Sequence, residues 1–142
     1  SPDEIYNRPA AQFVAGFTGS PPMNLVACHI DALGADLGLG ARIALPAELL
    51  ARAGSSEGHV FGIRPENLAL APRHVPGEVA VPAKVVISEP LGAETLVTFQ
   101  VGHVELVARC AASFKSPSGT AQTLYLDPSA MHLFCQASGQ AI

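Results

Sequence analysis

Positively charged side chains are scarce in this 142-residue chain. Its Lys and Arg residues number 8 against 12 Asp and Glu, the formal net charge is -4, and the only lysines are Lys84 and Lys115. Proteins bind nucleic acid through clusters of Lys and Arg, and anionic membrane surfaces attract basic runs. The sequence contains no such cluster, so its composition argues against both kinds of surface.

Long apolar runs are also absent, although apolar residues make up 49% of the sequence. No stretch approaches the roughly 20 apolar residues that a membrane-spanning helix needs. The first residues lack the basic and apolar regions of a signal peptide. We therefore expect a cytoplasmic protein whose apolar surface is buried in a core or covered by a partner.

Cysteine is too rare for a disulfide framework, because Cys28, Cys110 and Cys135 are odd in number and far apart. Two of them have a histidine nearby, in Cys28-His29 and in the segment 132–135. A zinc site needs three or four ligands, and adjacent residues of a strand point to opposite faces. Buried cysteines and partly exposed histidines explain these pairs better, and we predict no metal site.

Motifs for nucleotide or acyl chemistry are missing or misplaced. A P-loop ends in Gly-Lys-Ser/Thr, and neither lysine follows a glycine, which excludes ATP hydrolysis by that route. Residues 54–58 match G-x-S-x-G, but a nucleophile elbow follows a strand and precedes a helix, the reverse of the order expected here. We interpret residues 54–58 as a solvated loop.

Two carboxylates, Glu89 and Glu94, flank the turn expected at Leu91-Gly92. Their spacing would let them face each other across a hairpin, and paired carboxylates can carry out acid–base work. A solvated turn is the favoured interpretation, because Glu is rarely buried. The turn nevertheless remains a candidate contact site, because loops often carry recognition.

Helix signals are confined to three places. Ser1-Pro2-Asp3-Glu4 is typical of a capping box, and Pro9 ends the helix that follows it near Arg8. A second short helix is expected over residues 10–17 and a third over residues 46–54, each ending at glycine.

Strand patterns dominate the rest of the chain, while residues 31–40 are expected to form a loop. The odd-numbered positions from Val79 to Ile87 share one apolar face, and residues 24–30 are apolar on both faces. Many short strands with dense Gly and Pro punctuation predict a mainly β protein with a small OB-like barrel. The expected strands are residues 23–30, 41–45, 59–63, 68–70, 78–88, 94–101, 104–110, 122–127 and 132–135.

Several short motifs occur in an order that is specific when they are taken together. They are Glu4-Ile5-Tyr6-Asn7-Arg8-Pro9, residues 13–17, residues 19–24, Gly62-Ile63-Arg64-Pro65-Glu66, Glu89-Pro90-Leu91-Gly92-Ala93-Glu94-Thr95, and residues 124–127, 132–134 and 139–142. This series resembles the ATP-binding subunits of carbohydrate and glycerol-3-phosphate ABC importers, including the maltose type. The resemblance covers essentially the whole chain.

The resemblance implies a TOBE-type domain with an OB-like or MOP-like barrel at residues 23–142, after the end of an ATPase domain and its linker at residues 1–22. It implies a regulatory and dimerisation role without catalysis in this chain, with ATP and Mg bound only by the parent subunit's ATPase domain. The implied partners are that ATPase domain, a second copy of the subunit and, indirectly, the membrane permease subunits. The implied location is the cytoplasmic side of the inner membrane.

The matched motifs also supply candidate site residues. Those for interface or ligand contacts are Arg64, Glu66, Glu89, Gly92, Glu94 and Thr95. Those for contact with the ATPase domain are Ile5, Tyr6, Phe13 and Phe17, which we expect to be poorly covered, or packed on a neighbouring chain, when that domain is missing.

An alternative function is a small-ligand or oxyanion sensor. Ser88, Gly92 and Thr95 would supply the hydroxyl and backbone donors that an anion needs. Glu89 and Glu94 beside them would repel an anion, so this function ranks below the first. A stand-alone enzyme would need a constellation of catalytic residues that the sequence does not show.

Overall fold

The computed structural model of the protein describes residues 21–45, 47–53, 58–135 and 141. The helices expected within residues 1–17, with their candidate contact residues Ile5, Tyr6, Phe13 and Phe17, lie outside these ranges. Within the described part, no helix has the length and apolar character needed to cross a membrane.

Strands make up most of the described chain, which confirms the prediction of a mainly β protein. In chain order the elements are β1 (Asn24–Asp31), β2 (Gly34–Asp36), β3 (Arg42–Ile43), α3 (Ala47–Ala53), β4 (His59–Ile63), η1 (Pro65–Asn67), β5 (Leu68–Ala69), β6 (Val79–Pro90), β7 (Glu94–Val101), β8 (Val104–Ala111), β9 (Ala121–Leu126), η2 (Pro128–Ala130) and β10 (His132–Cys135).

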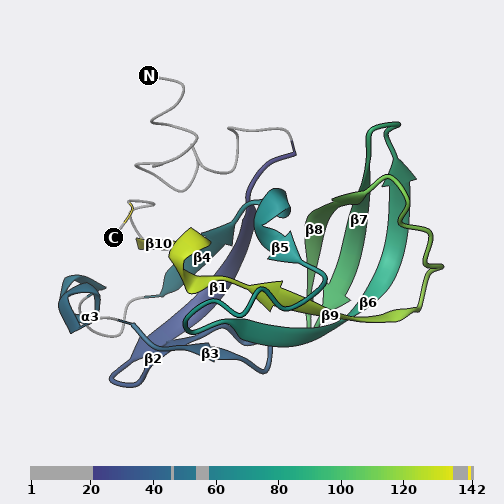
Figure 1. Ribbon diagram of the computed structural model, residues 1–142. Helices are drawn as coiled ribbons and strands as arrows, with labels where there is room; N and C mark the ends of the chain where they lie inside the picture. Colours follow the sequence, from purple (N-terminus) through teal and green to yellow (C-terminus); the bar gives the residue numbers. More distant parts are fainter. Residues whose placement is uncertain (1–20, 46, 54–57, 136–140, 142) are drawn as a thin grey trace.

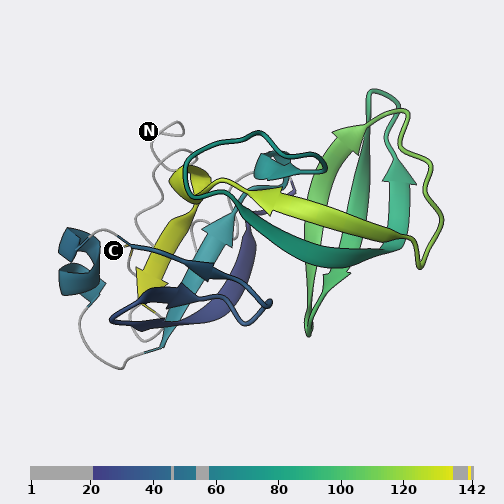
Figure 2. The same cartoon turned by 60° about the horizontal axis from the view of Figure 1, so that its bottom comes forward.

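The strands form two five-stranded sheets, which lie side by side in Figure 1. The first sheet has the order β10-β4-β1-β2-β3, and the second has the order β5-β9-β6-β7-β8. All of their strand pairs are antiparallel. Turning the molecule shows α3 at the outer end of the first sheet, away from the second (Figure 2).

The second sheet curls into a nearly closed barrel. Its long strand β6 pairs with β9 through its first half and with β7 through its second half. The two strands that end the order, β5 and β8, contact each other. Alternate residues point inward and are fully buried, among them Val81, Val97, Phe99, Leu106 and Leu124, as expected for a sheet with one face on the core.

A β-bulge corrects one expectation about β6. The pairing register shifts between Val85 and Ile87, so that Val85 lies opposite Phe99 but Ile87 lies opposite Thr98. A single extra residue moves the following side chains to the other face. Ile87 is therefore 61% exposed instead of sharing the buried face of Val81 and Val85.

The first sheet contains a strand where a loop was expected. Within residues 31–40, Gly34–Asp36 forms β2, paired with β1 on one side and β3 on the other. Pairing and burial override the poor strand propensity of Gly and Asp, because Ala35 and Leu37 are buried in the core. Gly34 has a φ of +125°, and a Cβ there would lie 2.2 Å from the carbonyl oxygen of Ile43, so only glycine fits.

The two sheets share one hydrophobic core, and Asn24 at the start of β1 joins them. Its Nδ2 donates to the carbonyl oxygens of Ile63 on β4 at 3.1 Å and Val107 on β8 at 2.9 Å. Its Oδ1 accepts from the N–H of Val107 at 2.8 Å. The side chain is 9% exposed, so these bonds satisfy polar groups that would otherwise be buried without partners.

Candidate interaction site around Arg109

Arg109 on β8 brings together the two motifs that the sequence analysis singled out. Its guanidinium forms an ion pair with Glu94 at the start of β7, and its Nε lies 3.8 Å from Oε1 of Glu66 in η1. These side chains are about one-third exposed, at 31%, 30% and 36% for Arg109, Glu94 and Glu66. Water therefore screens the pairs, which connect the start of β7 with η1 through one arginine.

The strand register explains why these charges meet. Arg109 lies opposite Leu96, while Glu94 lies two residues from Leu96 on the same face of β7. Diagonal neighbours on an antiparallel pair are within reach of long side chains. Glu66 reaches the same place because Pro65 begins the 3-10 turn directly after β4, with Arg64 still extended at φ -74° and ψ 149°.

The hairpin register does not place Glu89 directly opposite Glu94, the less favoured of the two interpretations of this turn. Glu89 lies opposite Leu96, and Pro90 lies opposite Thr95. The N–H of Leu91 donates to the carbonyl oxygen of Glu94 at 2.8 Å, so the hairpin register places Glu94 opposite Leu91. The carboxylate of Glu94 binds Arg109 instead, and the two glutamates do not form a catalytic pair.

The tip of the β6–β7 hairpin exposes apolar side chains. Leu91 is 51% exposed and Ile87 is 61% exposed, and Leu96 and Thr98 on the same outer side are half-buried. Gly92 gives the turn its left-handed residue, with a φ of +90°. We call Ile87, Leu91, Leu96 and Thr98 the hairpin surface. Exposed Glu89 lies between Ile87 and Leu91 on this face, opposite Leu96, so the hairpin surface combines apolar side chains with a carboxylate.

Arg64, a candidate contact residue, is largely buried, with 8% exposure. Its Nη1 lies 3.4 Å from Nε2 of His132 on β10. Burial, and then the positive charge of Arg64, lower the pKa of His132 below its usual 6.5. Arg64 is therefore a buried residue beside β10, and it lies apart from the exposed side chain of Glu66.

Thr95 is also an interior residue, with 1% exposure. Its Oγ1, like Oγ of Ser88, is a buried oxygen without a hydrogen-bond partner in the described part of the chain. Thr95 and Ser88 point to the inner face of the second sheet, because Thr95 lies opposite Pro90 and Ser88 lies opposite Val97. The structure thus separates Thr95 from the charged group of Glu94, Glu66 and Arg109.

The cysteines and histidines show no arrangement for metal. Among the described residues, no three or more His, Cys, Asp or Glu side chains are grouped so that they would hold an ion. Burial, and then the charge of Asp36, raise the pKa of the Cys28 thiol to about 11, and burial also raises the pKa of Cys110. Both thiols are therefore protonated and weakly nucleophilic near neutral pH.

Comparison with known families finds one model whose match contains both motifs, residues 62–66 and residues 89–95. A model described as "TOBE domain" matches residues 61–134, which is more than half of the chain. This span contains Glu66, Glu94 and Arg109. The chain belongs to the TOBE domain family. A second model, described as "MalK OB fold domain", matches residues 19–68, so the predicted OB-like character is confirmed as well.

Curated relatives of this TOBE protein match it along its whole length. The trehalose/maltose import ATP-binding protein MalK of Thermococcus litoralis is 40% identical over 149 residues, and the sn-glycerol-3-phosphate import ATP-binding protein UgpC of Salmonella typhimurium is 37% identical over 142 residues. The UgpC protein of Escherichia coli O157:H7 is 35% identical. In each case the alignment covers 100% of this chain but only about 40% of the relative.

Two residues of the TOBE chain escaped the sequence analysis. No motif singles out Arg109, although it is the single basic residue of β8. Asn24 was named only as the end of a motif, yet it is the polar residue directly before the apolar run at residues 25–28 of β1. An isolated polar residue in such a strand is a usable signal, because burial demands that it have partners.

Proposed function

We propose that this chain is the regulatory and dimerisation part of the ATP-binding subunit of an ABC importer for a carbohydrate or for glycerol 3-phosphate. The observation that carries the proposal is the full-length match to MalK and UgpC proteins, which are about 2.5 times longer (40% coverage). The chain itself contributes no catalysis on this view. ATP and Mg would be bound by an ATPase domain of the same subunit.

The structure supports a role based on contacts. Arg109 connects the hairpin with η1 through Glu94 and Glu66, so the hairpin surface and the second motif meet at one residue. A pair of identical subunits would bury the same patch twice, as two-fold symmetric dimers do. The further partners in the proposal are the membrane permease subunits, with the chain on the cytoplasmic side of the inner membrane.

A chimera tests the proposal. The matching part of Thermococcus litoralis MalK would be replaced by this chain, and ATP hydrolysis and molar mass in solution would be measured. The proposal expects the chimera to hydrolyse ATP and to be dimeric, while the isolated chain hydrolyses none. A chimera that folds, as judged by circular dichroism, but has lost the dimer would contradict the dimerisation role.

The hairpin surface is tested separately with point variants of the chimera. Leu91→Glu and Ile87→Glu place a charge where apolar surface would be buried, so we expect the dimer to weaken. Leu33→Glu is the matched control, because Leu33 is 76% exposed at the β1–β2 turn, outside the hairpin surface. Equal dimerisation of all three variants would exclude the hairpin surface as the interface.

One observation favours the alternative role in oxyanion sensing, namely the two buried hydroxyls of Ser88 and Thr95 without described partners. Calorimetry with molybdate, tungstate and sugar phosphates decides between the roles. Micromolar binding that is lost in Thr95→Val would establish the sensor role. If no heat of binding is measured at millimolar anion, the sensor role is excluded and the role in regulation and dimerisation is the one that remains.

A further inference from the structure

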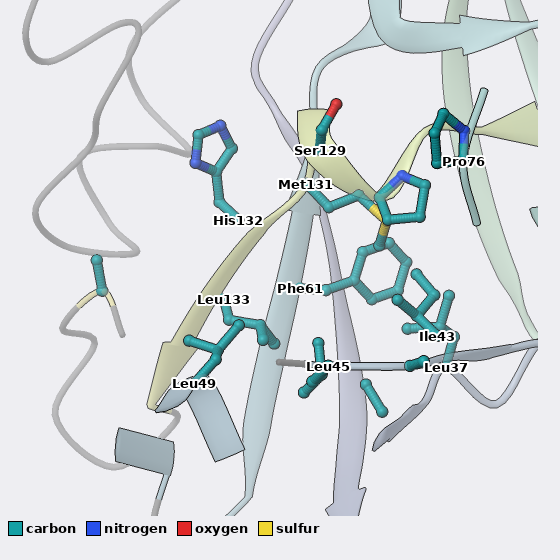
Figure 3. Close-up of a pocket in the computed structure, with 14 residues that line it drawn as sticks. Leu37, Ile43, Leu45, Leu49, Phe61, Pro76, Ser129, Met131, His132 and Leu133 are labelled. Carbon is teal, nitrogen blue, oxygen red and sulfur yellow. The ribbon is translucent and has the colours of Figure 1, made fainter. Parts of the chain in front are cut away.

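A cavity of about 520 Å³ opens beside the first sheet, away from the site around Arg109. Its walls come from β2, β3, β4, β10 and α3, and from the segments at Pro76 and Pro128 (Figure 3). The main apolar lining consists of Leu37, Ile43, Leu45, Phe61, Met131 and Leu133.

The cavity has a well-packed floor, formed by buried core residues, and walls that are formed by short elements. Phe61 and Leu37 are each 1% exposed, so the floor belongs to the packed core. The walls are less complete, because β3 has only two residues and α3 only seven. Leu45, Met131 and Leu133 pack against the core while remaining half-buried.

The described residues that line the cavity carry no charged side chain other than the titratable His132. No Lys, Arg, Asp or Glu is found among the described residues that line the cavity, and the polar side chains there are Ser129 and His132. In Figure 3 the hydroxyl of Ser129 and the ring of His132 point away from the group formed by Phe61, Met131 and Leu133. The lowered pKa of His132 favours its neutral ring near neutral pH, so His132 itself adds no positive charge to the rim.

We propose that this cavity binds an uncharged, predominantly apolar small molecule. Its volume lies within the roughly 300–1,000 Å³ of small-molecule sites, which are mainly lined by hydrophobic and aromatic side chains. A charged ligand would lose its hydration without gaining a counter-charge, and a sugar would leave most of its hydroxyls without partners. The cavity therefore selects against oxyanions, glycerol 3-phosphate and free sugars.

A ligand in the cavity would affect the motif at residues 62–66. His132, at its rim, lies 3.4 Å from Arg64, and Arg64 lies two residues before Glu66, which pairs with Arg109. A ligand that shifts the start of β10 would therefore shift the support of η1. That regulatory consequence rests on the proposed function, whereas binding itself does not.

A pair of matched probes tests the binding. N-phenyl-1-naphthylamine is uncharged and apolar, and 1-anilinonaphthalene-8-sulfonate has the same rings with a negative charge. Both would be titrated into the chain by fluorescence, with methyl NMR spectra to locate the site. We expect the neutral probe to bind at least about tenfold more tightly than the sulfonate and to shift the methyl signals of Ile43, Leu45 and Leu133.

Two variants narrow the mouth of the cavity without touching its floor. Ala44→Trp and Ser129→Trp change exposed lining residues, and we expect each to weaken the neutral probe at least about tenfold. Ala112→Trp, at an exposed turn outside the cavity, is the control and should bind as the unaltered chain does. The methyl spectra confirm that each variant is folded.

Three results would overturn the proposal. They are no binding of the neutral probe, equal binding by the mouth variants and the control, and methyl shifts confined to Leu33, Ile87 and Leu91, the exposed apolar residues elsewhere. Equal affinity for the sulfonate would overturn the uncharged ligand class. The probe experiment tests the cavity and the chimera tests the proposed function. The two can fail separately, because the probe can bind to the chain even if the chimera does not form a dimer.

Discussion

The two sheets of this molecule differ in how completely they are packed. In the second sheet β6, β7 and β8 have 12, 8 and 8 residues, and their inner side chains close on one another without exposure. In the first sheet β2 and β3 have three and two residues, and half-buried leucines surround a cavity. The two sheets therefore differ in the space that they leave, because the barrel of the second sheet is filled by side chains, whereas the first sheet lines a cavity of about 520 Å³.

Truncation of one leucine in each sheet should give the largest contrast. Leu124→Ala removes a fully buried side chain of the second sheet, and we expect a loss of about 3 kcal/mol in the free energy of unfolding, the usual result for such a cavity. Leu133→Ala removes a half-buried side chain beside an existing cavity, so about 1 kcal/mol is expected. Urea unfolding measures both, and equal losses would remove the contrast.

Replacement of Asn24, which joins the two sheets, should lower the free energy of unfolding almost as much. Asn24→Ala leaves two carbonyl oxygens and the N–H of Val107 without their partner, and we expect a loss of about 2–3 kcal/mol. Asn67→Ala is a matched control in η1, where the residue is half-buried, and should cost about 0.5 kcal/mol. Chemical denaturation of the two variants side by side decides whether Asn24 is special.

A smaller effect is expected at Arg109. Arg109→Ala removes its pairs with Glu94 and Glu66, which are about one-third exposed, so we expect a loss of about 1 kcal/mol that shrinks in 1 M salt. Arg73→Ala, at an exposed arginine, serves as control and should change stability by less than about 0.5 kcal/mol. Thermal unfolding at low and high salt gives the measurement, and a salt-independent loss would point to packing instead of charge.

The smallest effect concerns the pH dependence at His132. Because its pKa is lower in the folded state than the usual 6.5, the unfolded chain binds the proton first as pH falls. Stability contributed by the neutral ring is therefore complete above about pH 7 and decreases as pH falls through 6.5 towards the folded-state pKa. His132→Gln should reduce this decrease, whereas His103→Gln, at an exposed turn, should leave it unchanged.

The second sheet was predicted from the sequence almost strand by strand, because one buried face imposes a period of two. The expected strand at residues 104–110 became Val104–Ala111, and the one at residues 122–127 became Ala121–Leu126. The bulge after Val85 was not predicted, since an extra residue in one strand shows itself only in the pairing with the next.

The first sheet and the site were harder to predict. The strand Gly34–Asp36 has residues of low strand propensity and exists because its neighbours pair with it. The motifs supplied Glu66 and Glu94 as candidate contact residues, but they did not single out Arg109, beside which the structure places both carboxylates. The cavity beside Phe61 could not be predicted from the sequence, because it depends on how the consecutive elements β2, β3, α3 and β4 pack with the distant strand β10 and with the segments at Pro76 and Pro128.

Asn24 has a consequence beyond the joint that it forms. The strand β8 ends the order of its sheet, and an edge strand with free N–H and C=O groups invites a foreign strand to pair with it. The amide of Asn24 occupies both groups of Val107 in the middle of that edge, as a neighbouring peptide unit would. In a chain that is 49% apolar, Asn24 thereby blocks the addition of a foreign strand at Val107 of β8, and so opposes aggregation there.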